Sequence, residues 1–381
     1  MERSELGHWL RLLGTPEIGN DAARRLLTAF GTPGAVFAQD AEALAQVVSA
    51  RQRQHLSAPP PGHAELLDKT WHWLEQAPTQ RRVLTPGQAD YPVALLNMAD
   101  PPLLLYATGN FAHWPALAAM ADARRSLAIV GSRNPTPQGL AHARQFARGA
   151  AAAGWTVVSG LALGVDGAAH EGALDGAADG AEQLATVAVV GTGLDSVYPK
   201  AHLALARAIA ARGMLLSEYP LGTPPLAANF PRRNRIIAGL SRGTLVVEAA
   251  LRSGSLITAR LAAEQGREVF AIPGSIHAPQ ARGCHQLIQQ GAKLVTRIEE
   301  VLEEFAPATP APAMPAPDSP ADAGTDDEVL AHVGFDPMGL DALAARTGLP
   351  TATLQARLLE LELAGRIVRL PGALFQRFTA A

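Results

Sequence analysis

The feature that most constrains the fold is a series of short, strongly apolar runs between about Ser126 and Val295. They are rich in β-branched residues and apolar on both faces: SLAIVG, WTVVSG, ATVAVVG, MLLSE, GTLVVE and REVFAI. Segments of about 10 to 20 residues with helical spacing separate them. This alternation predicts a doubly wound α/β domain with a parallel sheet and right-handed crossovers. Because such sheets bind ligands beyond the carboxyl ends of their strands, the residues after each run are the candidate site.

A small helical module precedes this domain. Residues 6–13 and 21–30 have helical spacing around a turn that contains proline and glycine. We expect a domain over residues 1–80 that resembles a SAM or helix-hairpin-helix unit, and a central domain over residues 81–305. A helix–turn–helix unit of this kind can offer backbone amides to a DNA phosphate, or it can serve only for packing or dimerisation, and the sequence leaves both open.

The carboxyl-terminal part begins with a linker over residues 306–321, where six of sixteen residues are proline. Residues 322–381 then predict a winged-helix domain. Its expected elements are three helices, at 326–333, 339–348 and 351–365, and a two-stranded wing at 366–370 and 373–378. The third helix has one arginine and neither lysine nor asparagine, which favours an interaction module over base readout.

The overall charge limits how the chain could hold a polyanion. Its 381 residues include 32 Lys and Arg against 35 Asp and Glu, a net charge of −3, so a polyanion site must be built locally. The single cysteine, Cys284, excludes an intrachain disulfide and favours a reducing cytoplasm. We expect no export signal, because the first residues are charged. We also expect no membrane contact, because prolines and a glycine interrupt the longest uncharged stretch, residues 101–121.

Three loops follow the first three runs. Gly131-Ser132-Arg133 enters a helix and can hold an anion, or it can be a plain turn. The second loop begins at Ser159 and Gly160, where glycines allow close approach of a ligand. There Asp166 fits a helix N-cap better than an acid/base pair with His170. The third loop imitates a dinucleotide fingerprint, but Ser196 replaces the last glycine, so we expect no nicotinamide cofactor.

The most informative stretch is NFPRRNRII, residues 229–237. Residues 228–242 contain four arginines and no acid, with Phe230 beside them as a stacking platform. Guanidinium groups with one aromatic ring suit a flexible polyanion with exposed bases. The alternative is that these arginines form structural ion pairs with Glu218 and Glu248.

A second group of polar residues follows the fifth run. Ser253, Gly254, Ser255 and Thr258 place hydroxyls and free amides at a helix N-terminus, as in a phosphate site, unless Ser253 or Ser255 only caps the helix. Cys284 has no third orienting group beside His285, so we do not expect a nucleophile.

Taken together, these strings resemble the DNA-processing protein A family (DprA, also called Smf). The matching segments are AIVGSR (128–133), SGLALGVDGAAHEGAL (159–174), VAVVGTGLDSVYP (187–199), SEYPLGTPPLAANFPRRNRIIAGLS (217–241) and VVEAALRSGSLITARLAAEQGREVFAIPGS (246–275). The resemblance implies a non-catalytic, Rossmann-like domain that binds single-stranded DNA, forms a homodimer and helps to load the recombinase RecA during natural transformation. His202 and His285 stand where the family often has asparagine, and residues 175–183 look like a small acidic insertion.

These observations lead to a set of predicted DNA-binding residues, with no catalytic residue, metal or cofactor. The set is Gly131, Ser132, Arg133, Ser159, Gly160, Lys200, Phe230, Arg232, Arg233, Asn234, Arg235, Ser253, Gly254, Ser255 and Thr258. Two alternatives stay open. One is a nucleotide phosphoribohydrolase of the lysine-decarboxylase-like kind, whose PGGxGTxxE motif is only partly matched by LSRGTLVVE with Glu248. The other is a protein-interaction scaffold.

Overall fold

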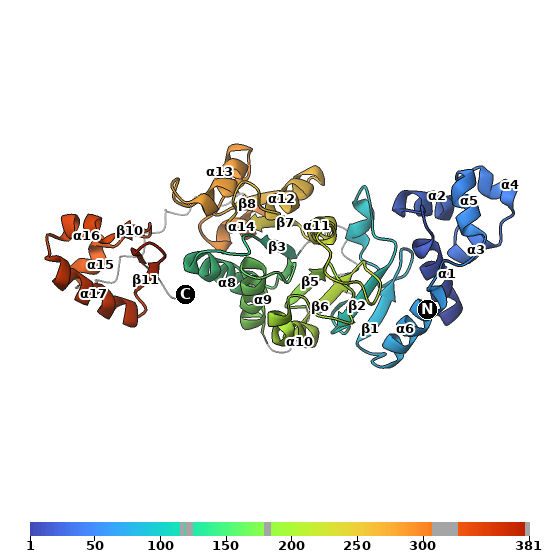
Figure 1. Ribbon diagram of the computed structural model, residues 1–381, viewed down its shortest axis with the longest axis horizontal. Helices are drawn as coiled ribbons and strands as arrows, with labels where there is room; N and C mark the ends of the chain where they lie inside the picture. Colours follow the sequence, from blue (N-terminus) through green and yellow to red (C-terminus); the bar gives the residue numbers. More distant parts are fainter. Residues whose placement is uncertain (115–117, 119–124, 179–183, 307–326, 378–381) are drawn as a thin grey trace.

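A computed structural model describes residues 1–114, 118, 125–178, 184–306 and 327–377. Along its longest axis, the amino-terminal helices lie at one end, the large sheet at the centre and the carboxyl-terminal domain at the other end (Figure 1). Among the described residues, no helix is long and apolar enough to span a bilayer.

The centre of the molecule is a nine-stranded sheet with the order β1-β2-β6-β5-β4-β3-β7-β8-β9. The strands from β3 to β9 pair in parallel wherever they are neighbours, which confirms the predicted doubly wound α/β fold. β1 and β2 extend one edge by antiparallel pairing and were not predicted. The strands are β1 (Arg81–Leu84), β2 (Leu105–Gly109), β3 (Ser126–Val130), β4 (Thr156–Ser159), β5 (Thr186–Val190), β6 (Met214–Ser217), β7 (Gly243–Val246), β8 (Glu268–Ala271) and β9 (Lys293–Leu294).

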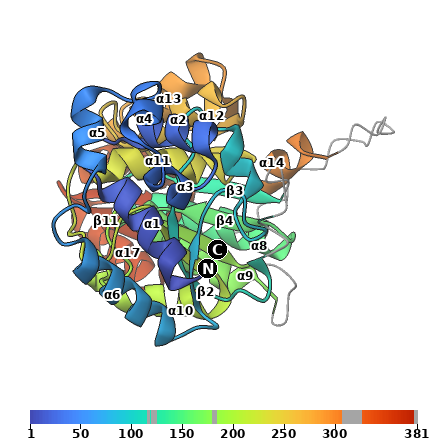
Figure 2. The same cartoon turned by 90° about the vertical axis from the view of Figure 1, so that its right-hand side faces the viewer.

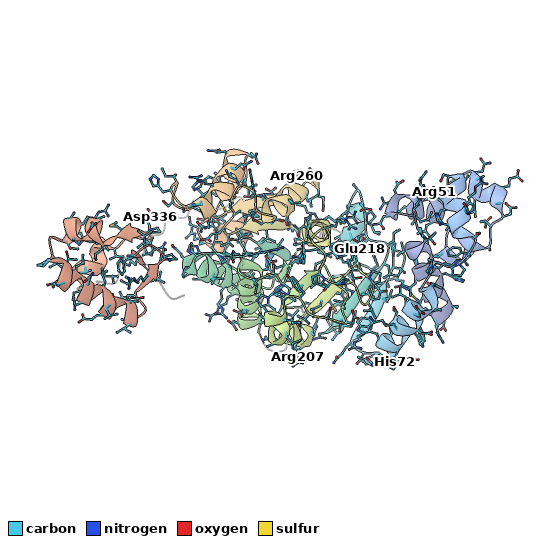
Figure 3. The ribbon with its side chains drawn as sticks, in the orientation of Figure 1. Arg51, His72, Arg207, Glu218, Arg260 and Asp336 are labelled. Atoms are coloured by element: carbon cyan, nitrogen blue, oxygen red, sulfur yellow. The ribbon has the colours of Figure 1, made fainter. Side chains whose placement is uncertain are left out.

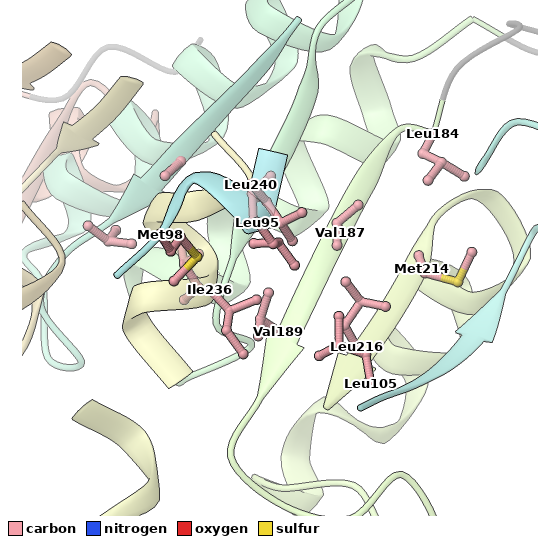
Figure 4. Close-up of a cluster of buried hydrophobic side chains, with 14 of the residues drawn as sticks. Leu95, Met98, Leu105, Leu184, Val187, Val189, Met214, Leu216, Ile236 and Leu240 are labelled. Carbon is pink, nitrogen blue, oxygen red and sulfur yellow. The ribbon is translucent and has the colours of Figure 1, made fainter. Parts of the chain in front are cut away.

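Helices cover both faces of this sheet because its strands are apolar on both sides. One face packs against α8 (Pro137–Ala152), α9 (Val165–Gly176), α10 (Leu203–Arg212) and α14 (Ile298–Glu304). The other face packs against α11 (Asn229–Gly239), α12 (Ser255–Glu264), α13 (Arg282–Gln289) and the 3-10 helix η1 (Val93–Asn97). Figure 4 shows part of the second layer, where Ile236 of α11 and Leu240 just after it lie in one buried cluster with Val187 and Val189 of β5.

The topological switch point lies between β3 and β7. The chain winds outward from β3 through β4, β5 and β6 and then returns to place β7 on the other side of β3. The helix after β3 therefore packs on one face of the sheet and the helix after β7 on the opposite face. Their divergence leaves a crevice at the carboxyl ends of these two strands, as expected for an open α/β sheet.

The amino-terminal helices form a unit against the β1–β2 edge of the sheet (Figures 1 and 2). They are α1 (Arg3–Gly14), α2 (Asn20–Phe30), α3 (Pro33–Phe37), α4 (Ala41–Ala45), α5 (Ala50–Leu56) and α6 (His63–Glu75). The two helices predicted around the glycine turn are α1 and α2. Their apolar core continues into Val83, Leu103 and Tyr106 near the sheet edge, so the unit shares its buried surface with the central sheet.

The carboxyl-terminal residues form the predicted winged helix. Its elements are α15 (Glu328–His332), β10 (Met338–Gly339), α16 (Leu340–Thr347), α17 (Thr351–Leu363), β11 (Ile367–Leu370) and β12 (Leu374–Arg377). The two wing strands pair as expected, and β10 adds a third strand that the sequence did not indicate. The predicted linker, from residue 307 onward, and residues 179–183 of the acidic insertion lie outside the described residues. The predicted domain boundaries stay predictions.

Candidate nucleic-acid interface

A cavity of about 730 Å³ occupies the crevice at the switch point. We call it the switch-point cavity. The loops after β3 and β7 and the amino-terminal turns of α11 and α12 line it. It brings together ten of the fifteen predicted site residues: Gly131, Ser132, Arg133, Phe230, Arg233, Asn234, Ser253, Gly254, Ser255 and Thr258. Segments separated by more than a hundred residues in sequence thus meet at one edge of the sheet.

Aromatic and cationic side chains stack at the mouth of this cavity. The guanidinium carbon of Arg133 lies 5.2 Å from the centroid of the Phe230 ring, within cation–π range. The Tyr198 ring is also close to Phe230, with its centroid 5.8 Å from that of Phe230 and its plane tilted by 41°. Arg133 and Tyr198 are exposed. This arrangement places two aromatic rings beside a positive charge, which suits a base and its phosphate.

Hydroxyl groups line the wall formed by the first turn of α12. The Ser253 and Ser255 hydroxyls lie 2.7 Å apart and hydrogen-bond to each other. The amides of Leu256 and Ile257 donate to the carbonyls of Ser253 and Gly254. Within the predicted group, the Ser253 amide donates to the Ala250 carbonyl and the Ser255 amide to the Ser253 hydroxyl, so the expectation of free amides is wrong for Ser253 and Ser255. The hydroxyls are the polar groups that this turn contributes to the cavity.

Arg233 forms the floor of the cavity and is only 4% exposed. Its guanidinium donates to the carbonyls of Gly160 and Val189 and lies 3.8 Å from the Asp166 carboxylate. Burial lowers the pKa of Arg233, while the charge of Asp166 opposes that shift. Burial also raises the pKa of Asp166, and the charge of Arg233 works against it. Arg233 therefore holds the ends of β4 and β5 together and contributes positive potential from below.

Two other predicted residues, Ser159 and Gly160, are also located in the interior near Arg233. Ser159 is fully buried, and its hydroxyl donates to the carbonyl of Ile129. A side chain at Gly160 would overlap the Arg233 guanidinium, so this position needs glycine for close approach. Both residues lie beneath the switch-point cavity and do not line it.

Arg235 points away from the cavity. Its guanidinium donates to both Glu218 carboxylate oxygens, at 2.5 and 2.6 Å, and lies 3.4 Å from Asp100. The alternative of a structural ion pair is confirmed for Arg235 and Glu218. Glu248, in contrast, accepts hydrogen bonds from the Thr136 amide at 2.9 Å and the Thr136 hydroxyl at 2.6 Å, at the start of α8.

Besides Arg235, two more predicted cations do not line the cavity. Arg232 is exposed on the first turn of α11, beside Pro231, which lines the cavity. Lys200 is exposed on the 3-10 helix η2 (Lys200–His202), two residues after Tyr198, and does not line the cavity. The structure thus brings Arg133 and Arg233 to the cavity itself and leaves Arg232 at its edge.

The loop after β4 differs from the expectation. The N-cap of α9 is Gly164, and Asp166 lies in the first turn, where its carboxylate accepts from the Ala162 amide at 3.3 Å. The prediction of an Asp166 cap is therefore wrong, because the carboxylate turns back to satisfy the preceding loop. His170 is fully buried beside the Thr186 hydroxyl, 2.7 Å from its Nδ1, and burial lowers its pKa to about 3.

The two histidines that depart from the family pattern, and the cysteine, have structural surroundings. His202 Nδ1 lies 3.0 Å from the Leu161 carbonyl, and His285 Nε2 lies 2.9 Å from the Gly274 carbonyl. Cys284 is buried, and burial raises the pKa of its thiol to about 12. Neither a reactive thiolate nor an exposed acid/base pair is formed at these positions.

Among the polar and aromatic residues that line the cavity, sequence reasoning missed Asn134, Tyr198 and Arg252, and it treated Asp166 only as a helix cap. Arg252 could have been included, since it directly precedes the serine loop and is exposed. Tyr198 lies in a loop after β5, and only the fold brings its ring to Phe230.

A doubly wound sheet with an arginine-lined crevice and an added winged helix defines a class of nucleic-acid-processing proteins, and family comparison makes this specific. Residues 82–306 match the family model described as DNA recombination-mediator protein A, and residues 310–373 match the DprA winged helix domain. The chain belongs to this DNA-processing family and is a recombination mediator by membership.

Individual relatives agree with this assignment. Protein Smf of Escherichia coli (strain K12) is 42% identical over 373 residues, covering 96% of this chain and 94% of the relative. DNA processing protein DprA of Streptococcus pneumoniae is 46% identical over 217 residues, covering 56% of this chain and 71% of the relative.

Two solved structures extend the comparison to three dimensions. The X-ray structure of DprA from Streptococcus pneumoniae superimposes with a TM-score of 0.59 and 35% identity, over 80% of this chain and 99% of that chain. A DprA structure from Helicobacter pylori, described as giving insight into its single-stranded DNA binding mode, has a TM-score of 0.51 and 30% identity. It covers 59% of this chain and 95% of that chain.

Proposed function

We propose that this protein binds single-stranded DNA at the switch-point cavity and acts there as a recombination mediator. Arg133 and Arg252 contact phosphates, Arg232 contacts them at the edge of the cavity, and the Ser253 and Ser255 hydroxyls provide further donors. Phe230, with Tyr198 beside it, receives a base. Sequence preference is expected to be slight, because stacking and phosphate contacts serve every base.

The observation that carries this proposal is the stack of Arg133 over Phe230 at the mouth of a polar cavity. In a chain with a net charge of −3, this edge collects exposed arginines from three separate segments. The binding mode named for the Helicobacter pylori relative supports the same ligand class. In this proposal Arg233 and Arg235, which the sequence placed among the binding residues, support the cavity through buried contacts and ion pairs.

The proposal includes no chemical step. Glu248, which the phosphoribohydrolase alternative requires, is held by Thr136 at the start of α8. The Asp166 carboxylate is buried against Arg233. We further propose that the protein works in the cytoplasm as a homodimer, protects incoming DNA and helps to load RecA in natural transformation, roles that follow from its family.

A gel-shift comparison of single-stranded and duplex DNA tests the proposal. Wild-type protein is expected to shift the single strand at lower concentration, and Arg133→Ala combined with Arg232→Ala is expected to weaken that shift by about tenfold or more. Arg148→Ala, which removes an exposed arginine from α8 on the opposite face of the sheet, is the matched control. Equal binding by the double variant and the wild type would refute the assignment.

A further inference from the structure

A second cavity of about 760 Å³ lies on the other side of the first turn of α11. We call it the α2 cavity. Its walls come from α1 and α2 of the amino-terminal unit, from the segment before β2, and from α11 and α12 of the central domain. Pro231 lines both cavities, and Arg232, the next residue, lines the α2 cavity. The two cavities are therefore neighbours across a single helical turn.

The walls of the α2 cavity are mainly apolar. Side chains from three parts of the chain form them: Leu10, Leu13, Ile18, Leu103, Leu104 and Ile257. A surface that combines apolar walls with adjacent cations is suited to a ligand that has both flat apolar groups and phosphates. A nucleic-acid strand with unpaired bases has both.

Two arginines of this cavity are available to a bound anion, whereas its acids are already in ion pairs and are not available to a cation. Arg232 and Arg260 are exposed, and the ion pair that Arg260 makes is with the exposed Glu264 at 3.5 Å, a surface pair of little strength. The two acids that line the cavity are already engaged. Arg235 pairs with both, and Arg24 of α2 also pairs with Asp100. Figure 3 shows the positions of Glu218 and Arg260.

We propose that a single strand leaving the switch-point cavity passes over Pro231 and Arg232 and continues into the α2 cavity, where Arg260 contacts its backbone. This inference rests on the proposed function and extends it. It makes the amino-terminal helical unit one wall of the DNA-binding site and so decides between the two roles that the sequence left open for that unit. The bound segment is then longer than the switch-point cavity alone can hold.

The test is a length-dependent binding measurement on the full chain. Fluorescence anisotropy would compare oligo-dT of roughly 6 and roughly 18 nucleotides, a range that spans usual single-strand site sizes. Arg260→Glu is expected to weaken binding of the longer strand by about tenfold, because it replaces a phosphate contact by repulsion. Binding of the shorter strand should change by less than about twofold, since Arg260 does not line the switch-point cavity.

A second variant tests the apolar part of the cavity. Gly19 lines it, and a Cβ built at Gly19 meets no atom within 4 Å, so Gly19→Trp can project into the space without a clash at Cβ. It is expected to reduce binding of the longer strand selectively, whereas Gly19→Ala should bind as wild type does. Arg148→Glu on α8 controls for the change in net charge, and circular dichroism confirms that each variant is folded.

The outcomes separate this inference from the proposed function. If wild-type protein binds neither strand, the proposed function fails. If wild-type protein binds both strands and Arg260→Glu and Gly19→Trp leave the longer one unaffected, the extension into the α2 cavity is wrong while the proposed function stands. Loss of both strands to the same degree in these variants would also overturn the extension.

Discussion

The salt dependence of DNA binding follows from the number of cations at the switch-point cavity. Arg133 and Arg252 line it, and exposed Arg232 lies on the adjoining turn. Each phosphate that a cation neutralises on a single strand contributes about −0.7 to the slope of log affinity against log salt, so three contacts predict a slope of about −2. Between about 50 and 200 mM salt, this slope corresponds to a loss of affinity of about 20-fold.

Removing Arg133 should change this slope as well as the affinity. Arg133→Ala is expected to make the slope shallower by about 0.7, because one phosphate contact is lost. The affinity should also fall at every salt concentration, since the guanidinium no longer stacks on Phe230. The assay is an anisotropy titration of a labelled, short oligo-dT at several sodium chloride concentrations, with Arg148→Ala as the control.

Two results would contradict this reasoning. A wild-type slope near zero would mean that phosphate contacts do not supply the affinity. An unchanged slope in Arg133→Ala, with weaker binding at all salt concentrations, would mean that Arg133 shapes the loop or stacks on a base without contacting a phosphate.

Two further predictions concern stability. The pKa of His170 is about 3 in the folded protein against 6.5 ordinarily, so the unfolded chain binds a proton that the native state does not. Its contribution to stability is therefore complete above about pH 6.5 and falls with pH by about 1.4 kcal/mol per unit below it. Urea unfolding at pH 7 and 5.5 should show a smaller loss in His170→Asn than in wild type. Burial also lowers the pKa of His142 and His63, which leaves a residual loss in both proteins; equal losses would contradict the prediction. Gly160→Ala should lower the unfolding free energy by about 2 to 4 kcal/mol, because the new methyl group displaces the buried Arg233 guanidinium. An unchanged thermal midpoint would contradict that account.

The parallel part of the sheet could be predicted because its signal is local. A strand buried on both faces is mostly apolar. β3 and β5 are buried at every position, and each has one polar residue, Ser126 or Thr186, at its start. β1 has only four residues, and two of them are partly exposed arginines, so no such pattern marks it. It forms because β2 pairs with β6 and offers β1 an antiparallel neighbour, a long-range condition that no short window of sequence contains.

The candidate site could be predicted only in part, because an α-helix points the side chains of adjacent residues in different directions. Successive residues of a helix point about 100° apart, so FPRRNR cannot form one continuous basic face. On α11, Arg232 points to solvent, Arg233 enters the floor beneath the cavity and Arg235 turns to Glu218. The sequence identifies these arginines as a group. Which of them can bind a ligand and which support the fold depends on how α11 packs.

The difference between exposed and buried arginines decides what a substitution in the FPRRNR segment can show. Arg233 is buried, and its removal would leave Asp166 as an unpaired buried carboxylate, a change that costs several kcal/mol in typical proteins. Loss of DNA binding in an Arg233 variant is therefore evidence about folding unless the variant is shown to be native. Arg232 is exposed, so its charge can be reversed at little cost to the fold, and the same loss there is evidence about the ligand. Only the exposed members of the motif can decide whether a polyanion binds at this edge of the sheet.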